Sequence, residues 1–218
     1  MKVLRLMAVV ALCATWPVAA ASAGQRGDHA KPAVTSAAHS SAAELRTAMR
    51  KLWTDHVVWT RDYIVAAVDD KPDAMAAANR LMRNQEDIGK AVGQYYGSAA
   101  GQQLTSLLKD HISIAVDLIK AAKAGDKTAQ QQADTRWQQN AVDIATFLSK
   151  ANPRFWKRAE LRAMLGEHLR LTTAEVVARL NRDWAADVAA YGRVHRHALG
   201  MADALSTGIV EQFPNRFR

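Results

Sequence analysis

The sequence carries one short pattern three times, as LWTDHV at residues 52–57, LLKDHI at residues 107–112 and MLGEHL at residues 164–169. Each copy holds two apolar residues, a spacer, an acidic residue, a histidine and an aliphatic residue. The apolar residues around each copy follow the period of an α-helix. Successive histidines lie 55 and 57 residues apart, a distance that accommodates two helices and their connections. We therefore expect a helical hairpin that occurs three times.

The second helix of each predicted hairpin repeats as well. It reads AxxRLxxNxxDI from residue 77, AxxRWxxNxxDI from residue 133 and, in a degenerate copy, AxxRVxxHxxGM from residue 190. Asn84, Asn140 and His197 follow the three histidines by 28, 29 and 29 residues. This regular spacing predicts that each histidine faces the same position of its partner helix.

Residues 44–213 are expected to form the folded part of the chain, with no stretch of the period-2 alternation that strands show. Turn and cap signals divide it into hairpins at 44–97, 98–152 and 153–213, followed by a tail at 214–218. These signals are Pro72, Gly97, Ser98, Gly125, Asp126 and Asp183. The predicted fold class is all-α, a six-helix bundle made of three homologous antiparallel helical hairpins.

The first residues resemble a secretory signal peptide. Lys2 and Arg5 precede an apolar stretch at residues 6–16, Pro17 breaks it, and the small residues 21–23 fit a cleavage site. Loss of residues 1–23 would remove Cys13 and lower the formal net charge from +8 to +6. We expect a periplasmic or secreted protein with a flexible leader at residues 24–43 and no transmembrane span in the mature chain.

Composition narrows the function classes. The chain is 49% hydrophobic, which argues against wholesale disorder, and its single cysteine excludes a disulfide scaffold or a cysteine-based zinc site. No phosphate-binding loop, nucleophile elbow or HExxH motif is present. The basic residues form no stripe, so we expect an envelope or extracellular partner and no nucleic acid.

The three histidines are the strongest candidates for a site. His56, His111 and His168 lie on mostly apolar helix faces and are expected to point inward, with Glu175 two turns beyond His168. If they converge, they suit a transition metal such as zinc, copper or non-haem iron. The alternative is that each imidazole makes the same packing contact within its own hairpin, a device that duplication would copy.

We favour the packing alternative, which places the three imidazoles about 8–10 Å or more apart, at the spacing of packed helix axes. Each should then be buried and hydrogen-bonded within its own hairpin. Further polar residues of the second helices are expected to support this polar core: Arg80, Asn84, Asp87, Arg136, Asn140, Asp143, Arg193 and His197.

Four blocks of the sequence are similar to a known family. They are LWxxHVxWTR from residue 52, NQxDIG from residue 84, WAAD from residue 184 and GIVxQFP from residue 208. They resemble a family of small secreted all-helical bacterial proteins, and the resemblance spans nearly the whole mature chain. Some members carry glycosyltransferase or kinase names, which we do not adopt because nucleotide-sugar enzymes normally need an α/β sheet. The resemblance implies no catalytic residues.

The function hypothesis placed first is a secreted or periplasmic binding or interaction protein without evident catalytic machinery. The alternative is a metal-binding protein that uses the inward-facing histidine set. An enzyme of unknown reaction is the third hypothesis.

Overall fold

The computed structural model describes residues 41–217, and within that range the chain forms six α-helices and no strand. The all-α prediction is confirmed. The predicted signal peptide and residues 24–40 of the predicted leader lie outside the described residues. The helices are α1 (Ala42–Val68), α2 (Ala74–Tyr96), α3 (Ser98–Ala124), α4 (Lys127–Ala151), α5 (Arg158–Leu180) and α6 (Trp184–Gln212), followed by a 3-10 turn, η1 (Pro214–Arg216).

Local sequence signals explain most helix ends. Asp126 and Asp183 cap α4 and α6 as predicted, because each side chain accepts a hydrogen bond from a first-turn amide. Gly97 and Gly125 follow α2 and α3 with φ angles of 92° and 71°, which other residues rarely adopt. Ser41 forms a capping box with Glu44 that starts α1 two residues before the predicted boundary.

Two predicted start signals were wrong. Ser98 is the first residue of α3 rather than its cap, and no side chain caps that helix. Pro72 lies in the turn before Asp73 and Ala74, so α2 begins beyond the proline.

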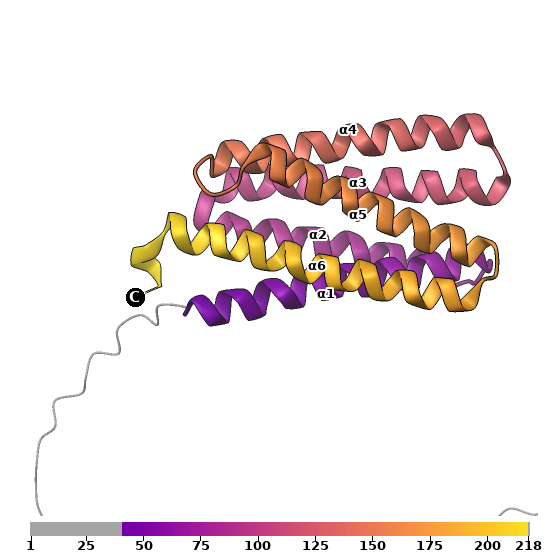
Figure 1. Ribbon diagram of the computed structural model, residues 1–218, viewed down its shortest axis with the longest axis horizontal. Coiled ribbons are helices and arrows are strands. Elements are labelled where there is room, and N and C mark those ends of the chain that lie inside the picture. The colour runs from indigo at the N-terminus through magenta and orange to yellow at the C-terminus, as the bar shows by residue number, and fades with distance from the viewer. Residues whose placement is uncertain (1–40, 218) are drawn as a thin grey trace, which may run out of the picture. The chain divides into compact units, whose positions relative to one another are not determined.

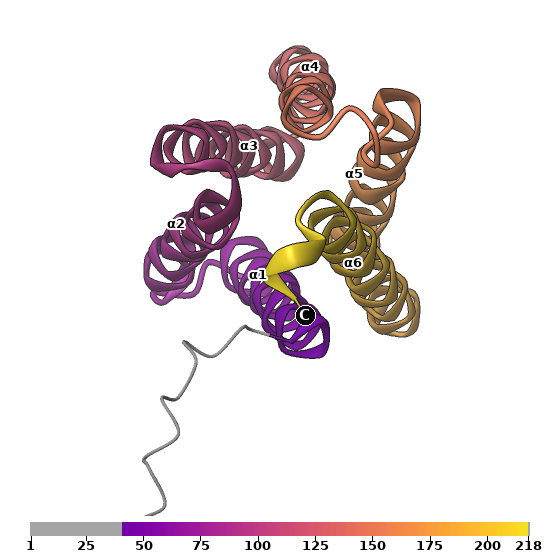
Figure 2. The same ribbon diagram turned by 90° about the vertical axis from the view of Figure 1, so that its left-hand side faces the viewer.

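The helices form a closed ring in which each packs against its neighbours in the chain and α6 returns to pack against α1 (Figures 1 and 2). The predicted hairpins α1–α2, α3–α4 and α5–α6 are each in contact along the bundle. Helix α1 also contacts α3 and α5. The inner faces of these three odd-numbered helices therefore meet inside the ring.

The contact between α2 and α3 is especially close, although it crosses a predicted hairpin boundary. A Cβ atom on Gly89 would lie 2.6 Å from the Gly101 carbonyl oxygen, and one on Gly93 would lie 3.3 Å from the Gly101 Cα. Larger side chains there would push the helices apart. The first and second hairpins are thus joined as tightly as the helices within them, whereas the α4–α5 contact between the second and third hairpins is less extensive.

Two apolar clusters build the core. The larger draws buried residues from all six helices, and the smaller contains Tyr63, Ile64, Ala77, Ala78, Ile119 and Val176. Part of the predicted tail packs as well, since Arg216 donates a hydrogen bond of 2.8 Å to the Gln94 carbonyl and Phe217 stacks on Tyr95. No helix in residues 41–217 is both long and apolar enough to cross a membrane.

Candidate functional site

A cavity of about 500 Å³ lies between α1, α3, α4 and α5. Its walls are mainly apolar and include Ile112, Leu118 and Ile119 of α3 and Val176 of α5. Its mouth lies beside the start of α4, where the exposed residues Lys127, Gln131 and Asp134 border it. The bundle therefore offers a sheltered apolar volume with a polar opening.

His56, His111 and His168 line the inner end of this cavity and also border a second, apolar cavity of about 50 Å³. The ring centroids of His56 and His168 are 5.7 Å apart, and those of His111 and His168 are 6.3 Å apart. The expected separation of about 8–10 Å was wrong. The reason is that the three residues occupy the inner faces of α1, α3 and α5, which meet inside the ring. We call these three side chains the imidazole floor.

His111 is held at both ring nitrogens. The Trp137 indole N–H donates to Nε2 over 3.1 Å, and Nδ1 lies 2.7 Å from the Asn140 side-chain oxygen. Asn140 in turn donates to the Leu107 carbonyl, which fixes the orientation of its amide. Nε2 must therefore accept and Nδ1 must donate, so His111 is a neutral, fully hydrogen-bonded imidazole. The predicted burial and own-hairpin partner are confirmed for this residue.

His56 is half-buried and uses one nitrogen. Gln85 donates its side-chain amide to the Leu81 carbonyl over 2.9 Å and also lies 3.2 Å from His56 Nδ1. The contact with a carbonyl identifies the approaching Gln85 atom as the nitrogen, so His56 Nδ1 accepts. His56 has an own-hairpin partner as predicted, and its Nε2 has none among the described residues.

His168 departs from the prediction. Its side chain is buried, with 6% exposure, yet its Nδ1 has no hydrogen-bond partner within residues 41–217. Buried polar atoms normally find a partner, and leaving one unpaired costs about 1–3 kcal/mol. The expectation of a hydrogen-bonded imidazole was therefore wrong in the third hairpin.

Aligned positions of the second helices explain why the three histidines differ. Asn84, Asn140 and His197 all donate to a carbonyl of the preceding helix, at Leu52, Leu107 and Met164 respectively. Only Asn140 also offers an oxygen to its histidine. The Asn84 oxygen lies 3.2 Å from the Gln85 amide nitrogen instead, and His197 has no oxygen. Likewise, the position of Trp137 is occupied by Leu81 and Val194, which cannot donate.

The imidazole floor is uncharged at neutral pH. Burial lowers the pKa of His56 to about 4, and the nearby His111 lowers it as well. Burial also lowers the pKa of His111 to about 4. Burial and then the neighbouring imidazoles hold the pKa of His168 well below its ordinary value. The inner end of the cavity thus presents neutral nitrogen donors and acceptors.

In this geometry the floor does not form the metal set that we considered as the alternative to packing. Within residues 41–217, no group of three or more His, Cys, Asp or Glu side chains is arranged to hold a metal ion. His111 has both nitrogens engaged, and Glu175 is hydrogen-bonded to Arg61 rather than to a histidine. A metal would have to break the Trp137 or Asn140 contact before His111 could ligate it.

The predicted supporting polar core is only partly present. Asn84 and Asn140 are buried, and His197 is half-buried beside His168 with ring centroids 6.2 Å apart. Arg80 is half-buried over the Trp59 ring and near Asp55. The other four residues are exposed, because they lie on the outer sides of α2, α4 and α6: Asp87, Arg136, Asp143 and Arg193.

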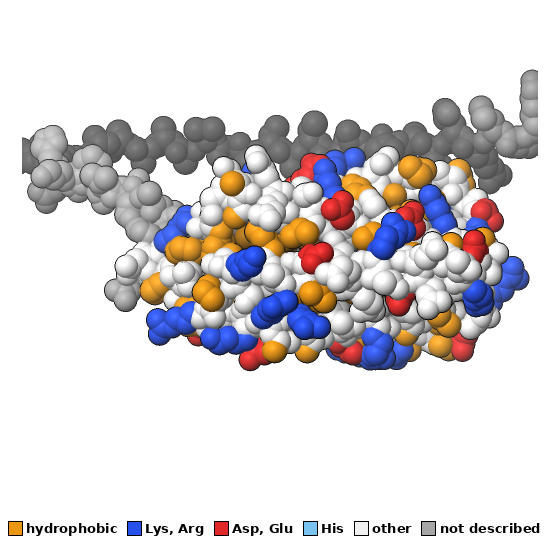
Figure 3. Space-filling view, turned by 90° about the horizontal axis from the view of Figure 1, so that it is seen from above, with side chains coloured by type: hydrophobic (Ala, Val, Ile, Leu, Met, Phe, Trp, Pro, Cys, Tyr) orange, Lys and Arg blue, Asp and Glu red, His pale blue; other side chains and the backbone are white. Residues whose placement is uncertain are grey.

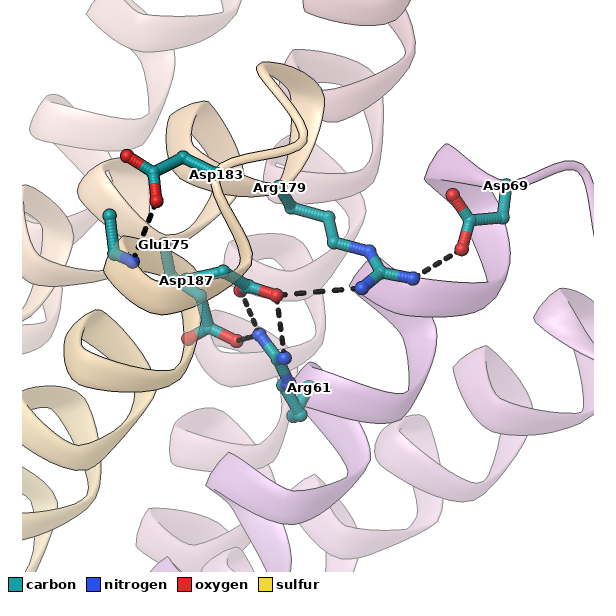
Figure 4. Close-up of polar contacts among 7 residues, drawn as sticks. Arg61, Asp69, Glu175, Arg179, Asp183 and Asp187 are labelled. Atoms are coloured by element: carbon teal, nitrogen blue, oxygen red, sulfur yellow. Dashed lines mark hydrogen bonds and ion pairs between the residues drawn. The ribbon is translucent and has the colours of Figure 1, made fainter.

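A second buried polar group, which sequence reasoning missed, joins α1, α5 and α6 (Figure 4). Arg61 binds both carboxylate oxygens of Asp187, one of them over 2.7 Å, and donates to Glu175 over 2.9 Å. Arg179 reaches Asp187 over 3.5 Å and also binds Asp69. We call Arg61, Glu175, Arg179 and Asp187 the Arg61 cluster.

The two carboxyl groups of the Arg61 cluster differ in charge. Hydrogen bonding to Arg61 is the main effect that lowers the pKa of Asp187. Burial raises the pKa of Glu175 to about 7, against the opposing effect of Arg61, and the charge on Asp187 adds to the rise. Asp187 is therefore the lasting counter-ion of Arg61, whereas Glu175 titrates near neutrality.

Two sequence signals point to the missed residues once the hairpins are aligned. Gln85 occupies a buried position where the other copies have Ala141 and Ala198, so a polar residue there needs a specific partner. Asp187 is a carboxylate in the first turn of α6, which favours negative charge. No local signal pairs Asp187 with Arg61, because the two residues are 126 positions apart.

On the face that α4 presents, basic and acidic side chains are interspersed (Figure 3). This face therefore offers no extended basic surface for an anionic polymer.

No family model, curated protein or solved structure matches the chain. The resemblance to a family of secreted helical proteins stays a prediction.

Proposed function

We propose that this protein binds an apolar small molecule in the cavity between α1, α3, α4 and α5. The observation that carries the proposal is the combination of a 500 Å³ volume, apolar walls and an uncharged imidazole floor. Ligand sites are typically cavities of about 300–1,000 Å³ with a few placed polar groups. The cavity has this size and this distribution of polar groups.

Binding fits these residues better than catalysis. A general acid or base works best when its pKa lies near the working pH. His56 and His111 have pKa values of about 4, and His111 has no free nitrogen with which to move a proton. For the residues of this cavity, this supports binding over catalysis.

The proposed setting is the periplasm or the outside of the cell, which rests on the signal-peptide pattern of residues 1–23. In that setting, the protein would carry or sequester a poorly soluble molecule. The charged mouth keeps the opening in water while the apolar walls shield the bound molecule.

Nile red, an uncharged dye that becomes fluorescent in apolar surroundings, provides a direct test. Titration of the purified protein should give saturable fluorescence. Ala115→Phe places a ring in the cavity and should weaken binding at least tenfold. Ala189→Phe is the matched control, since Ala189 is exposed on α6 and does not border the cavity.

Two outcomes would overturn the proposal. One is the absence of saturable binding by the wild-type protein. The other is equal binding by the wild type and both variants, because that result would place the dye on the outer surface.

A further inference from the structure

The free nitrogens of the imidazole floor carry information about the ligand. Both ring nitrogens of His111 are hydrogen-bonded, to Trp137 and Asn140, so neither is available to a ligand. His56 Nδ1 accepts a hydrogen bond from the Gln85 side chain. The donor that remains at the inner end of the cavity is His56 Nε2, beside the ring of His168.

The proton of His56 can be placed from its neighbours. Its Nδ1 accepts from Gln85, whose amide orientation is set by the Leu81 carbonyl. A neutral imidazole that accepts at one nitrogen carries its proton on the other. His56 Nε2 is therefore an N–H donor without a partner among the described residues.

His168 supplies a second unsatisfied group beside it. Its ring lies 5.7 Å from that of His56 between centroids, and its Nδ1 is buried and unpaired. Because this buried Nδ1 is closed to a water-sized molecule, it is not open to a ligand in the cavity. A bound molecule that offers a lone pair at this point would satisfy His56 Nε2 and lie beside the His168 ring.

We infer that the ligand is a neutral, largely apolar molecule with a carbonyl-type acceptor oxygen at its inner end, held by His56 Nε2–H beside His168. This inference rests on the proposed function and names its ligand class. The oxygen lies deep in the cavity and the apolar body extends along α3 and α5 toward the mouth.

The charge of the surroundings selects against an ionised inner end. Among residues 41–217, no lysine or arginine borders the inner end of the cavity, and Lys127 and Asp134 both border its mouth. A carboxylate at the floor would lose its hydration without gaining a cation, which is costly. Ketones, quinones and similar uncharged carbonyl compounds avoid that cost.

A pair of rigid probes of the same shape tests the inference. Fluorene is a hydrocarbon, and fluorenone differs from it by one carbonyl group. Their dissociation constants follow from displacement of Nile red, with the dye affinity measured separately for each protein. In the wild-type protein, fluorenone should bind at least as tightly as fluorene, although its carbonyl must give up water.

Variants then locate the hydrogen bond. His56→Phe removes the donor and should shift the fluorenone-to-fluorene preference roughly tenfold toward fluorene, the size of one net hydrogen bond. His56→Gln keeps an N–H donor and should retain part of the preference. His195→Phe is the control, because His195 lies between α1 and α6, near Thr54, and borders neither cavity.

A spectroscopic measurement avoids reliance on the folding of the variants. The carbonyl stretching band of fluorenone bound to the wild-type protein should lie at lower frequency than in hexane, as hydrogen bonding requires. An unshifted band, or the same probe preference in wild type and His56→Phe, overturns the inference while both probes still bind. If neither probe nor the dye binds, the proposed function itself fails.

Discussion

The imidazole floor and the Arg61 cluster are both buried polar groups inside the same bundle, yet they differ in what they leave unsatisfied. In the Arg61 cluster, guanidinium and carboxylate groups face one another across three helices (Figure 4). Among its charged groups, the Arg179 Nε is buried without a partner within residues 41–217. In the imidazole floor, neutral rings border a cavity, and only His111 is fully hydrogen-bonded.

This difference separates a structural group from a binding group. Burial of two charges costs desolvation free energy, and their attraction offsets that cost only when the partners are close. Such a pair therefore holds its helices in contact and leaves no opening between them. An uncharged imidazole can remain partly unpaired at moderate cost and keep a nitrogen for a ligand. The Arg61 cluster therefore holds α1, α5 and α6 in place, whereas the imidazole floor keeps an unpaired nitrogen beside the cavity.

Acidification should lower the free energy of unfolding more than any substitution below, because it protonates the imidazole floor. In the unfolded chain the histidines titrate near 6.5, whereas in the fold the pKa values of His56 and His111 are about 4. The unfolded state thus binds protons first, so the stability that these residues contribute is complete above pH 6.5 and is lost as pH falls toward 4.

Glu175 opposes this trend. Its pKa is raised to about 7, so its contribution is largest at low pH and is lost as pH rises through about 7. With this opposing effect of Glu175 included, we expect the free energy of unfolding to drop by about 4 kcal/mol between pH 6.5 and 4.5, measured by urea titration with circular dichroism. His168→Phe should flatten the decline. A stability that does not change across this window would contradict the neutral floor.

Asp187→Asn should have the next largest effect. It removes the two-pronged partner of Arg61 and weakens the link to Arg179, which leaves buried positive charge poorly compensated. We expect a loss of about 3 kcal/mol in the free energy of unfolding at pH 7.5. Asp203→Asn is the control, because its ion pair with Arg50 is exposed and screened by solvent. Equal small losses in both variants would mean that the Arg61 cluster is no anchor.

Substitutions within the floor should distinguish its members. His111→Phe leaves the Trp137 N–H and the Asn140 oxygen without their partner and should cost about 2 kcal/mol. His168→Phe breaks no side-chain hydrogen bond within the described residues and should leave the thermal midpoint unchanged or raise it. Equal destabilisation by the two substitutions would show that His168 is bound as firmly as His111.

Glu175→Gln should change the free energy of unfolding least, and the size of the change should depend on pH. The amide mimics the protonated acid, so the variant avoids the cost of ionising a buried group. Relative to wild type, it should gain about 1–1.5 kcal/mol in the free energy of unfolding between pH 6 and pH 8.5. Urea titrations at the two pH values check this. A constant difference would place the pKa of Glu175 outside that range.

Much of the fold was predictable because its signals are local. The caps Asp126 and Asp183 and the glycines at 97 and 125 act within a few residues of their own helix. The spacing of 29 residues between His111 and Asn140 likewise predicted a contact that the hairpin forms. Such signals do not depend on how distant helices are rotated.

The candidate site was predictable only in part. The inward direction of the histidines follows from helical periodicity, but their convergence depends on how closely α1, α3 and α5 approach inside the ring. The unpaired His168 depends on His197 standing where Asn140 stands in the second hairpin. The sequence contains this substitution, and its effect appears only once the two helices are packed.

Within residues 41–217, the sequence by itself determined that the chain forms six helices, where most of them end, and that three histidines recur on their inner faces. The reason is that periodicity and capping are properties of short segments. The tertiary structure decided which imidazole nitrogens stay free, and that Glu175 serves Arg61 rather than the histidines. The first outcome depends on how the two helices of each hairpin pack, at positions 26 to 29 residues apart. The second depends on helices that are distant in the chain, because Arg61 and Glu175 are 114 positions apart.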